Sequence, residues 1–251
     1  MTEQSDIKLS NYQVDHLGDR LRAGQPSADD LRLLDRYRRS FAESYEYVIS
    51  AIRNQLKLDP TGRPTKSTAS IVGKLRREST RLSQMQDIAG CRIVLPDVVT
   101  QDSVVQGLVS HLGKVKVFDR RYSPSHGYRA VHIVVSHSQK NVEIQIRSVL
   151  QHMWAELSEK LADVIDPAVK YGRGPEWLRI ALMEVSKGIT EWERLETQLC
   201  EINPDARNLP TLPRDFDRSN QRTSAAKSEA GRVLAERLIE LMVKLSNHTG
   251  S

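Results

Sequence analysis

Residues 128–148 read YRAVHIVVSHSQKNVEIQIRS, and this stretch decides the fold. It holds two runs rich in β-branched residues, joined by the polar segment HSQK, a pattern that predicts an antiparallel hairpin. In the second run apolar and polar residues alternate, and the polar ones are Glu143, Gln145 and Arg147. Because successive side chains of a strand point to opposite faces, we expect one face to join the core and the other to present a polar row.

The segments around this hairpin extend the pattern in both directions. Residues 90–96 (GCRIVLP) and 114–121 (KVKVFDRR) are further β-branched runs, and the sequence between them predicts a helix. Apolar residues at three- and four-residue steps predict helices before and after these strands. The predicted helices span residues 31–57, which form one long amphipathic helix, and residues 70–79, 148–165 and 175–199. We therefore predict an α+β fold, a mixed β-sheet of four to five strands flanked by helices.

The domain organisation follows from changes in composition along the chain. Residues 1–27 are polar and predict an N-terminal arm, either loose or a short helix, and residues 28–165 form the central domain. Residues 166–202 predict a helical extension. Residues 203–224 contain three prolines and no apolar period, which predicts a linker, and residues 225–251 predict a C-terminal amphipathic helix.

Composition excludes several classes of protein. The 251 residues include only two cysteines and no apolar run near the length of a membrane span, and the first residues do not resemble a secretion signal. We therefore expect a cytoplasmic protein that does not engage a membrane. Residues 61–92 contain seven basic and two acidic residues. Such concentrated positive charge favours a phosphate-bearing partner, although a solvated helix face is an equally good interpretation of charge alone.

Two carboxylates stand out near the predicted sheet. Asp87 precedes the first predicted strand, and Glu143 lies on the polar face of the last one. Two acids on neighbouring strands could hold Mg²⁺ together with phosphate oxygens. The simpler alternatives are that Asp87 caps a helix or turn and that Glu143 is an ion-pair partner.

The segment SPSHGYRAVH, residues 123–132, places an aromatic residue among cations. Tyr128, Arg129 and His132 follow Gly127 at a junction between loop and strand. An aromatic ring beside cations can stack on a base and bind phosphate. A tyrosine that packs against the core remains the alternative.

Together these segments resemble the RelA/SpoT family of alarmone synthetases. The matching motifs are RPTKSTASIVGKL from residue 63, MQDIAGCRIV from 85, PSHGYRAVHIVV from 124 and VEIQIRSVLQHMWAELSEK from 142. The resemblance implies a nucleotidyltransferase-like fold and transfer of the β,γ-pyrophosphate of ATP to the ribose 3′-hydroxyl of GDP or GTP, which makes (p)ppGpp and releases AMP. Since the motifs begin at Arg63, it also implies a small, single-domain synthetase.

The resemblance assigns a role to each matching residue. It implies that Asp87 and Glu143 hold Mg²⁺ and that Glu143 is the base toward the 3′-hydroxyl. The residues implied to bind ATP are Arg63, Lys66, Ser70, Lys74, Arg92 and Arg121. The residues implied to bind the acceptor are Tyr128, Arg129, His132, Gln145 and Arg147.

The acceptor loop departs from the family pattern. It is one residue shorter than usual and lacks the lysine that grips acceptor phosphates. This departure is compatible with the toxic branch of the family, which pyrophosphorylates the 3′ end of tRNA and pairs with an antitoxin protein. For that alternative we expect basic residues outside the ATP motifs to contact tRNA phosphates, namely Arg36, Arg38, Arg39, Arg76, Arg77 and Arg81. A second alternative is an inactive nucleotide sensor, and either form could assemble as a homo-oligomer.

Overall fold

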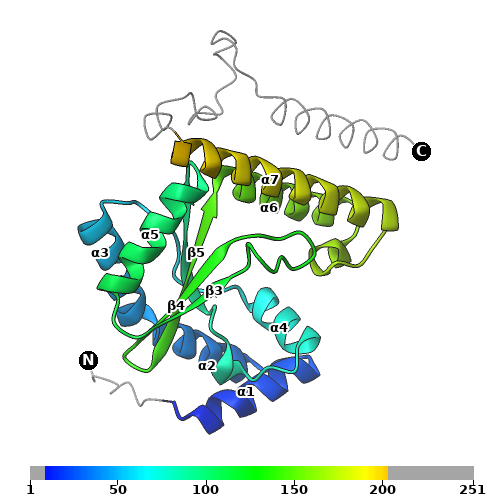
Figure 1. Cartoon of the computed structure of the whole chain (residues 1–251). Helices are drawn as coiled ribbons and strands as arrows, with labels where there is room; N and C mark the ends of the chain where they lie inside the picture. Colours follow the sequence, from blue (N-terminus) through cyan, green and yellow to red (C-terminus); the bar gives the residue numbers. More distant parts are fainter. Residues whose placement is uncertain (1–8, 203–251) are drawn as a thin grey trace, which may run out of the picture. The chain divides into compact units, whose positions relative to one another are not determined.

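The computed structural model describes residues 9–202, an α+β fold with a mixed five-stranded sheet (Figure 1). The helices are α1 (Asn11–Ala23), α2 (Ala28–Arg39), α3 (Ala42–Leu56), α4 (Thr68–Arg77), α5 (Val98–His111), α6 (Val149–Val164) and α7 (Glu176–Ile202), with 3₁₀ turns η1 (Leu82–Gln84) and η2 (Pro167–Tyr171). The strands are β1 (Thr61–Arg63), β2 (Ala89–Leu95), β3 (Val115–Asp119), β4 (Val131–His137) and β5 (Lys140–Ser148). The predicted linker and C-terminal amphipathic helix lie outside the described residues.

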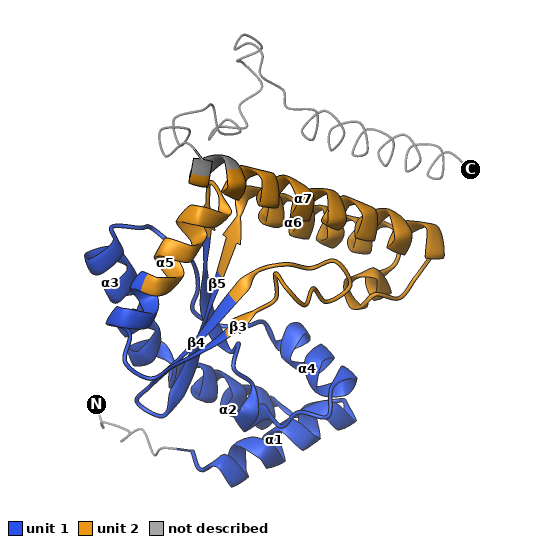
Figure 2. Cartoon of the chain, viewed as in Figure 1, with its two compact units in different colours: residues 1–93, 107–117, 132–145 blue, residues 94–106, 118–131, 146–251 orange. Residues whose placement is uncertain are grey.

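The sheet order is β1-β2-β5-β4-β3, with β1 antiparallel to β2. The fold class is therefore as predicted, and the short strand β1 is the fifth strand. Contacts divide the chain into two compact units (Figure 2). Unit 1 contains residues 1–93, 107–117 and 132–145, and unit 2 contains the remainder. Each unit is described by itself below.

In unit 1, the N-terminal segment forms a helix rather than a loose arm. Ser10 caps α1, and its side chain and that of Gln13 form a reciprocal capping box. Residues Leu17 and Leu21 are fully buried, and α1 contacts α2, α4 and η1. A Cβ atom at Gly18 would lie 2.8 Å from Cβ of Leu82, so glycine allows α1 to approach η1 closely. Helix α1 thus supports α4 from outside the predicted central domain.

The prediction of one long helix over 31–57 was wrong, because two helices, α2 and α3, replace it. The Ser40 hydroxyl donates to the Tyr37 carbonyl at 2.6 Å, and the Ser40 N–H bonds to carbonyls of the last turn of α2. Side chains that bond to a nearby carbonyl compete with the helical ladder. Phe41, directly after the break, is buried, with 2% of its surface exposed. The helical spacing of apolar residues therefore continues across the break, and the sequence pattern does not reveal it.

The predicted hairpin is confirmed. Strands β4 and β5 are neighbours joined at Ser138 and Gln139, whose φ values are 44° and 64°. Two successive residues with positive φ are typical of a type I′ turn, which matches the twist of an antiparallel pair. The apolar residues of β5, including Val142 and Ile144 in unit 1, have no exposed surface. One face of the strand therefore joins the core.

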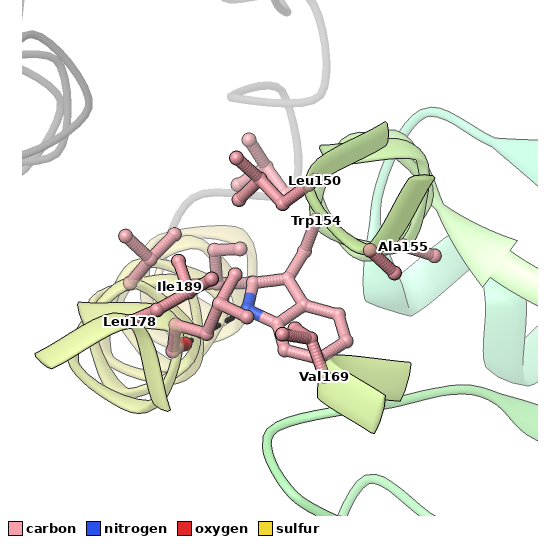
Figure 3. Packing of buried hydrophobic residues seen from close by; sticks show 10 residues of the cluster. Leu150, Trp154, Ala155, Val169, Leu178 and Ile189 are labelled. Atoms are coloured by element: carbon pink, nitrogen blue, oxygen red, sulfur yellow. Dashed lines mark hydrogen bonds between the residues drawn. The ribbon is translucent and has the colours of Figure 1, made fainter. Parts of the chain in front are cut away.

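In unit 2, Trp154 lies at the centre of the packing between α6, η2 and α7 (Figure 3). Its indole N–H donates to the Leu182 carbonyl at 2.9 Å, so burial of the ring leaves no unpaired donor. Leu178 and Ile189 of α7 and Val169 of η2 belong to the same buried cluster. The predicted helices at 148–165 and 175–199 thus form one packed layer. Among residues 9–202, no helix is long and apolar enough to cross a membrane.

Candidate active site

In unit 1, two lysines converge on one carboxylate. Lys66 Nζ lies 2.7 Å from Oδ2 of Asp87, and Lys74 Nζ lies 3.1 Å from Oδ1. Lys66 precedes α4 and its N–H donates to the Ile88 carbonyl at 2.7 Å, while Lys74 is in the last turn of α4. The Asp87 side chain is 14% exposed. Asp87 is therefore the centre of a partly buried ion-pair cluster rather than a helix cap.

The cluster strongly stabilises the ionised form of Asp87. Burial alone would raise the pKa of this carboxyl, but the charges and hydrogen bonds of Lys66 and Lys74 outweigh burial and lower the pKa to about 2. The lysines in turn hold an anion in place. An incoming phosphate would meet two ammonium groups already gathered at one point.

Glu143 is held by two neighbours on the polar face of the hairpin. One carboxylate oxygen lies 2.9 Å from His132 Nδ1, and the other accepts a hydrogen bond from the Gln145 amide at 3.0 Å. Burial would raise the pKa of Glu143, but His132 and Gln145 lower it overall. A Cβ atom at Gly90 would lie 2.5 Å from the Glu143 carbonyl oxygen, so glycine allows β2 to pass close to β5. The strand pairing thus carries Glu143 toward the residues that follow Asp87.

The two carboxylates fit a magnesium ion that phosphate completes. The negative charge of Asp87 opposes ionisation of Glu143, so the two groups sense each other electrostatically. Mg²⁺ in nucleotide-binding sites is usually held by one or two carboxylates plus phosphates and water. Within residues 9–202, no group of three or more His, Cys, Asp or Glu side chains could hold a metal. Magnesium binding by Asp87 and Glu143 stays a prediction.

Of the other predicted ATP-binding residues, three belong to the same unit as the lysines and one does not. Arg63 donates to the Asp87 carbonyl at 2.9 Å, and Ser70 lies in the first turn of α4 beside the capping Ser67. Arg92 lies on β2 opposite Thr61. These residues and the two lysines all belong to unit 1.

Arg121 is placed differently, because it belongs to unit 2 and is 8% exposed. Its guanidinium contacts carboxylate oxygens of Asp119 at 2.6 Å and Asp102 at 2.7 Å. It also donates to the Gln101 side chain at 3.3 Å. Arg121 is therefore a buried arginine whose two carboxylate partners are more exposed, and ATP binding by this residue stays a prediction.

The predicted acceptor residues fall into two groups. His132 and Gln145 lie in unit 1, where both contact Glu143. In unit 2, Arg147 Nη2 donates to the Tyr128 hydroxyl at 3.1 Å, and its guanidinium carbon lies 5.1 Å from the Tyr128 ring centroid. The Tyr128 ring is tilted by 57° to that of Trp154, with 6.5 Å between centroids. Tyr128 is half-buried and has both an arginine and a tryptophan as neighbours.

The loop before Tyr128 requires glycine at Gly127. This residue has φ +89°, and an added Cβ would lie 2.7 Å from the Trp154 ring. Ser125 and Tyr128 pair across the turn through two backbone hydrogen bonds, at 2.9 and 3.3 Å. The motif that marked this loop in the sequence thus has a steric basis.

Sequence reasoning missed two residues of α7 that contact this loop. Ser186 Oγ donates to the Gly127 carbonyl at 2.7 Å, and a Glu193 oxygen lies 3.3 Å from Arg129 Nη2. The signal was a glutamate and a serine on the face of α7 that also carries Leu182 and Ile189. Polar residues on a buried helix face need partners, which identifies the positions but not the partners.

Another acidic residue of α7, Glu196, gives a pH-dependent prediction. Burial raises the pKa of Glu196, and the charges of Asp97 and Glu193 raise it further, to about 7 from an ordinary value of 4.5. The pKa of Glu196 is therefore higher in the folded protein than in the unfolded chain. Protonated Glu196 contributes its full stability below pH 4.5, and this contribution to the free energy of unfolding is lost as the pH rises through about 7. We expect Glu196→Gln to raise the free energy of unfolding by about 2 kcal/mol at pH 8 and to change it little at pH 4.5. Urea denaturation at both pH values checks this, and equal effects at both would contradict it.

Comparison with known proteins identifies the family of the chain. Residues 62–162 match the model of the region found in RelA / SpoT proteins. The GTP pyrophosphokinase YjbM of Bacillus subtilis is 34% identical over 157 residues, which cover 57% of this chain and 70% of that protein. The uncharacterized protein Rv1366 of Mycobacterium tuberculosis is 38% identical over 117 residues. The match covers 45% of this chain and 43% of Rv1366, so the chain spans less than half the length of that relative.

Solved structures share the fold. The crystal structure of the small alarmone synthetase 1 from Bacillus subtilis matches with a TM-score of 0.51 and 26% identity, over 72% of this chain and 99% of that one. A GTP pyrophosphokinase family protein from Streptococcus pneumoniae matches with a TM-score of 0.50 and 22% identity, over 72% of this chain and 96% of that one. On these grounds the chain belongs to the RelA/SpoT family.

Proposed function

We propose that this chain is a pyrophosphokinase that transfers the β,γ-pyrophosphate of ATP to the 3′-hydroxyl of GDP or GTP, which makes (p)ppGpp and releases AMP. The observation that carries the proposal is the partly buried cluster of Lys66, Asp87 and Lys74, within electrostatic reach of Glu143. Two cations and two acids in one unit suit the transfer of a highly charged group. A relative that is named a GTP pyrophosphokinase supports the choice of acceptor.

The proposed step forms one bond and breaks one. The 3′-oxygen of the acceptor attacks the β-phosphorus of ATP, and the bond from that phosphorus to the oxygen bridging α and β breaks, so that AMP leaves. The hydroxyl proton passes to the Glu143 carboxylate. The lowered pKa of Glu143 keeps it ionised and ready to accept a proton, although it is a weak base. Proximity to the hydroxyl therefore has to supply much of the effect.

Lys66 and Lys74 act by exchanging one anion for another. In the structure both lysines bind Asp87, and we propose that the phosphates of ATP replace the Asp87 carboxylate as their partner. Asp87 and Glu143 would then hold Mg²⁺. When bound, the ion would offset charge on the transferred phosphates. The ammonium groups meanwhile neutralise charge that builds up on the leaving AMP.

The tRNA alternative loses part of its support. Arg38, predicted to face tRNA, donates to Asp35 at 2.7 Å and to the Thr68 hydroxyl at 2.7 Å, and its side chain is 12% exposed. It therefore braces the start of α4 and is poorly placed to reach a nucleic acid. The guanine nucleotide remains the preferred acceptor, while an antitoxin, a homo-oligomer and an inactive sensor stay predictions.

A comparison of three acceptors tests the proposal. ATP labelled in its γ-phosphate is incubated with Mg²⁺ and with GDP, GTP or bulk tRNA, and the products are separated by chromatography. We expect label on the guanine nucleotide. Label on tRNA alone would favour the alternative acceptor, and no transfer to any acceptor would contradict an active pyrophosphokinase.

Tyr128→Ala separates the two substrates. Stacking of a base on an aromatic ring contributes roughly 1–3 kcal/mol, so we expect the acceptor KM to rise about 5- to 100-fold. The KM for ATP should change little, because the residues proposed to bind the ATP phosphates, Lys66 and Lys74, are unchanged in this variant. Steady-state kinetics with each substrate varied in turn measure both values. A rise in the KM for ATP alone would mean that Tyr128 serves the donor.

A further inference from the structure

Helix α7 lies beyond residues 62–162, the part that matches the family model, yet it contacts both neighbours of Tyr128. Ser186 Oγ donates to the carbonyl of Gly127, the residue before Tyr128, at 2.7 Å. Glu193 Oε2 lies 3.3 Å from Nη2 of Arg129, the residue after it. Ser186 and Glu193 are seven residues apart and hence on one face of the helix. One helix face thus fixes the chain on both sides of the tyrosine.

The same carboxylate also fixes the partner of Tyr128. Glu193 Oε1 accepts from Ser148 Oγ at 2.6 Å and from the Gln151 amide at 2.9 Å. Ser148 directly follows Arg147, whose guanidinium bonds to the Tyr128 hydroxyl. Glu193 therefore holds the residue that follows each member of the Tyr128–Arg147 pair.

Burial makes these contacts strong constraints. Glu193 is 4% exposed, Ser186 3% and Ser148 2%, and both oxygens of the Glu193 carboxylate have partners. Removing one partner from a buried, hydrogen-bonded charge pair is costly, because the other charge stays buried. The local backbone is also constrained, since Gly127 packs on Trp154 with positive φ. The tyrosine has little freedom as long as α7 is in place.

We infer that Ser186 and Glu193 are positioning residues, which hold the Tyr128–Arg147 pair in the orientation that receives the base of the acceptor nucleotide. This inference rests on the proposed function, because it takes Tyr128 as the acceptor platform. Both residues act through Gly127, Arg129 and Ser148. A misplacement of about 1 Å in a positioning group can cost roughly 100-fold in rate, so small shifts of the ring are expected to matter.

The test compares two variants with two matched controls. Ser186→Ala should raise the acceptor KM about 5-fold and Glu193→Gln about 10- to 100-fold, with the KM for ATP within about twofold of wild type. Ser158→Ala is the control for the serine, because Ser158 is buried on α6 and has no hydrogen bond to residues 122–129 among the described residues. Glu191→Gln is the control for the glutamate, because Glu191 pairs with Arg194 on the exposed side of α7. Neither control should change either KM.

A double-mutant cycle separates positioning from a general structural effect. In a Tyr128→Ala background the effects of Ser186→Ala and Glu193→Gln should largely disappear, since both act through the tyrosine. Effects that persist in full in that background, or that raise both KM values together, would overturn the inference. If Glu193→Gln melts below the assay temperature, Ser186→Ala decides alone.

Binding without turnover distinguishes this inference from the proposed function. GDP affinity is measured by titration calorimetry in the absence of ATP for wild type and Ser186→Ala. Wild type that binds GDP but transfers no pyrophosphate contradicts the proposed function, while weaker binding by Ser186→Ala still supports the positioning role. Equal GDP affinity of the two proteins overturns the inference, and wild type that does not bind GDP overturns both.

Discussion

Glu143→Gln is expected to lower kcat by at least about 1,000-fold while the affinity for ATP stays within about threefold of wild type. The amide keeps the size of the side chain and can still accept a hydrogen bond from Gln145. The substitution removes the negative charge that attracts His132. With this charge it also removes the proposed metal ligand and the proposed proton acceptor. The loss should therefore fall on turnover and not on binding of the donor.

Single-turnover measurements with saturating ATP and acceptor check this expectation, and calorimetry with a non-hydrolysable ATP analogue checks donor binding. Glu191→Gln serves again as control, because it removes an exposed carboxylate by the same chemical change. A Glu143→Gln protein that keeps more than about a tenth of wild-type turnover would contradict the role of Glu143.

Asp87→Asn should have opposite effects on ATP binding and on transfer. Without metal, Asp87 competes with the ATP phosphates for Lys66 and Lys74. Removing its charge frees both ammonium groups, so in EDTA we expect ATP to bind about 3- to 10-fold more tightly than to wild type, equivalent to about 1 kcal/mol. With Mg²⁺, loss of a metal ligand should lower kcat at least about 100-fold.

Calorimetry in EDTA and kinetics with Mg²⁺ measure the two halves of this prediction separately. Lys66→Met is the complementary variant, because it removes one of the two cations, and we expect it to weaken ATP binding in EDTA. Weaker ATP binding by Asp87→Asn in EDTA would mean that the lysines do not receive the phosphates. Unchanged transfer would mean that Asp87 is not needed for the metal.

The sequence predicted what depends on local pattern. Alternation in residues 142–147 fixed which side chains of β5 enter the core, and the structure buries Val142 and Ile144 completely. Gly90 belongs to the motif MQDIAGCRIV, which the sequence shows. The structure explains why a glycine stands there, because β2 approaches the Glu143 carbonyl closely at this position. Periodicity failed at Ser40, where α2 ends and the Ser40 hydroxyl bonds to the Tyr37 carbonyl, because the apolar pattern does not change there.

Contacts between distant segments were beyond prediction from one sequence. Lys66, Lys74 and Asp87 were each assigned to ATP or metal, yet in the structure they pair with one another. Arg129 was assigned to the acceptor, but its partner, Glu193, lies on α7 and 64 residues further along the chain. A sequence predicts which buried polar residues need partners, whereas only the fold chooses which partner each one has.

The most direct test of pyrophosphate transfer follows both ends of ATP in one reaction. ATP that carries one label in adenine and another in the γ-phosphate is incubated with GDP and Mg²⁺, and every labelled product is quantified against time. The proposal predicts that wild type makes one AMP for each guanosine product that carries the γ label and makes no ADP. With Glu143→Gln, both products should form at least about 1,000-fold more slowly. Appearance of ADP in step with the labelled product, or AMP with no label on the guanine nucleotide, would contradict it.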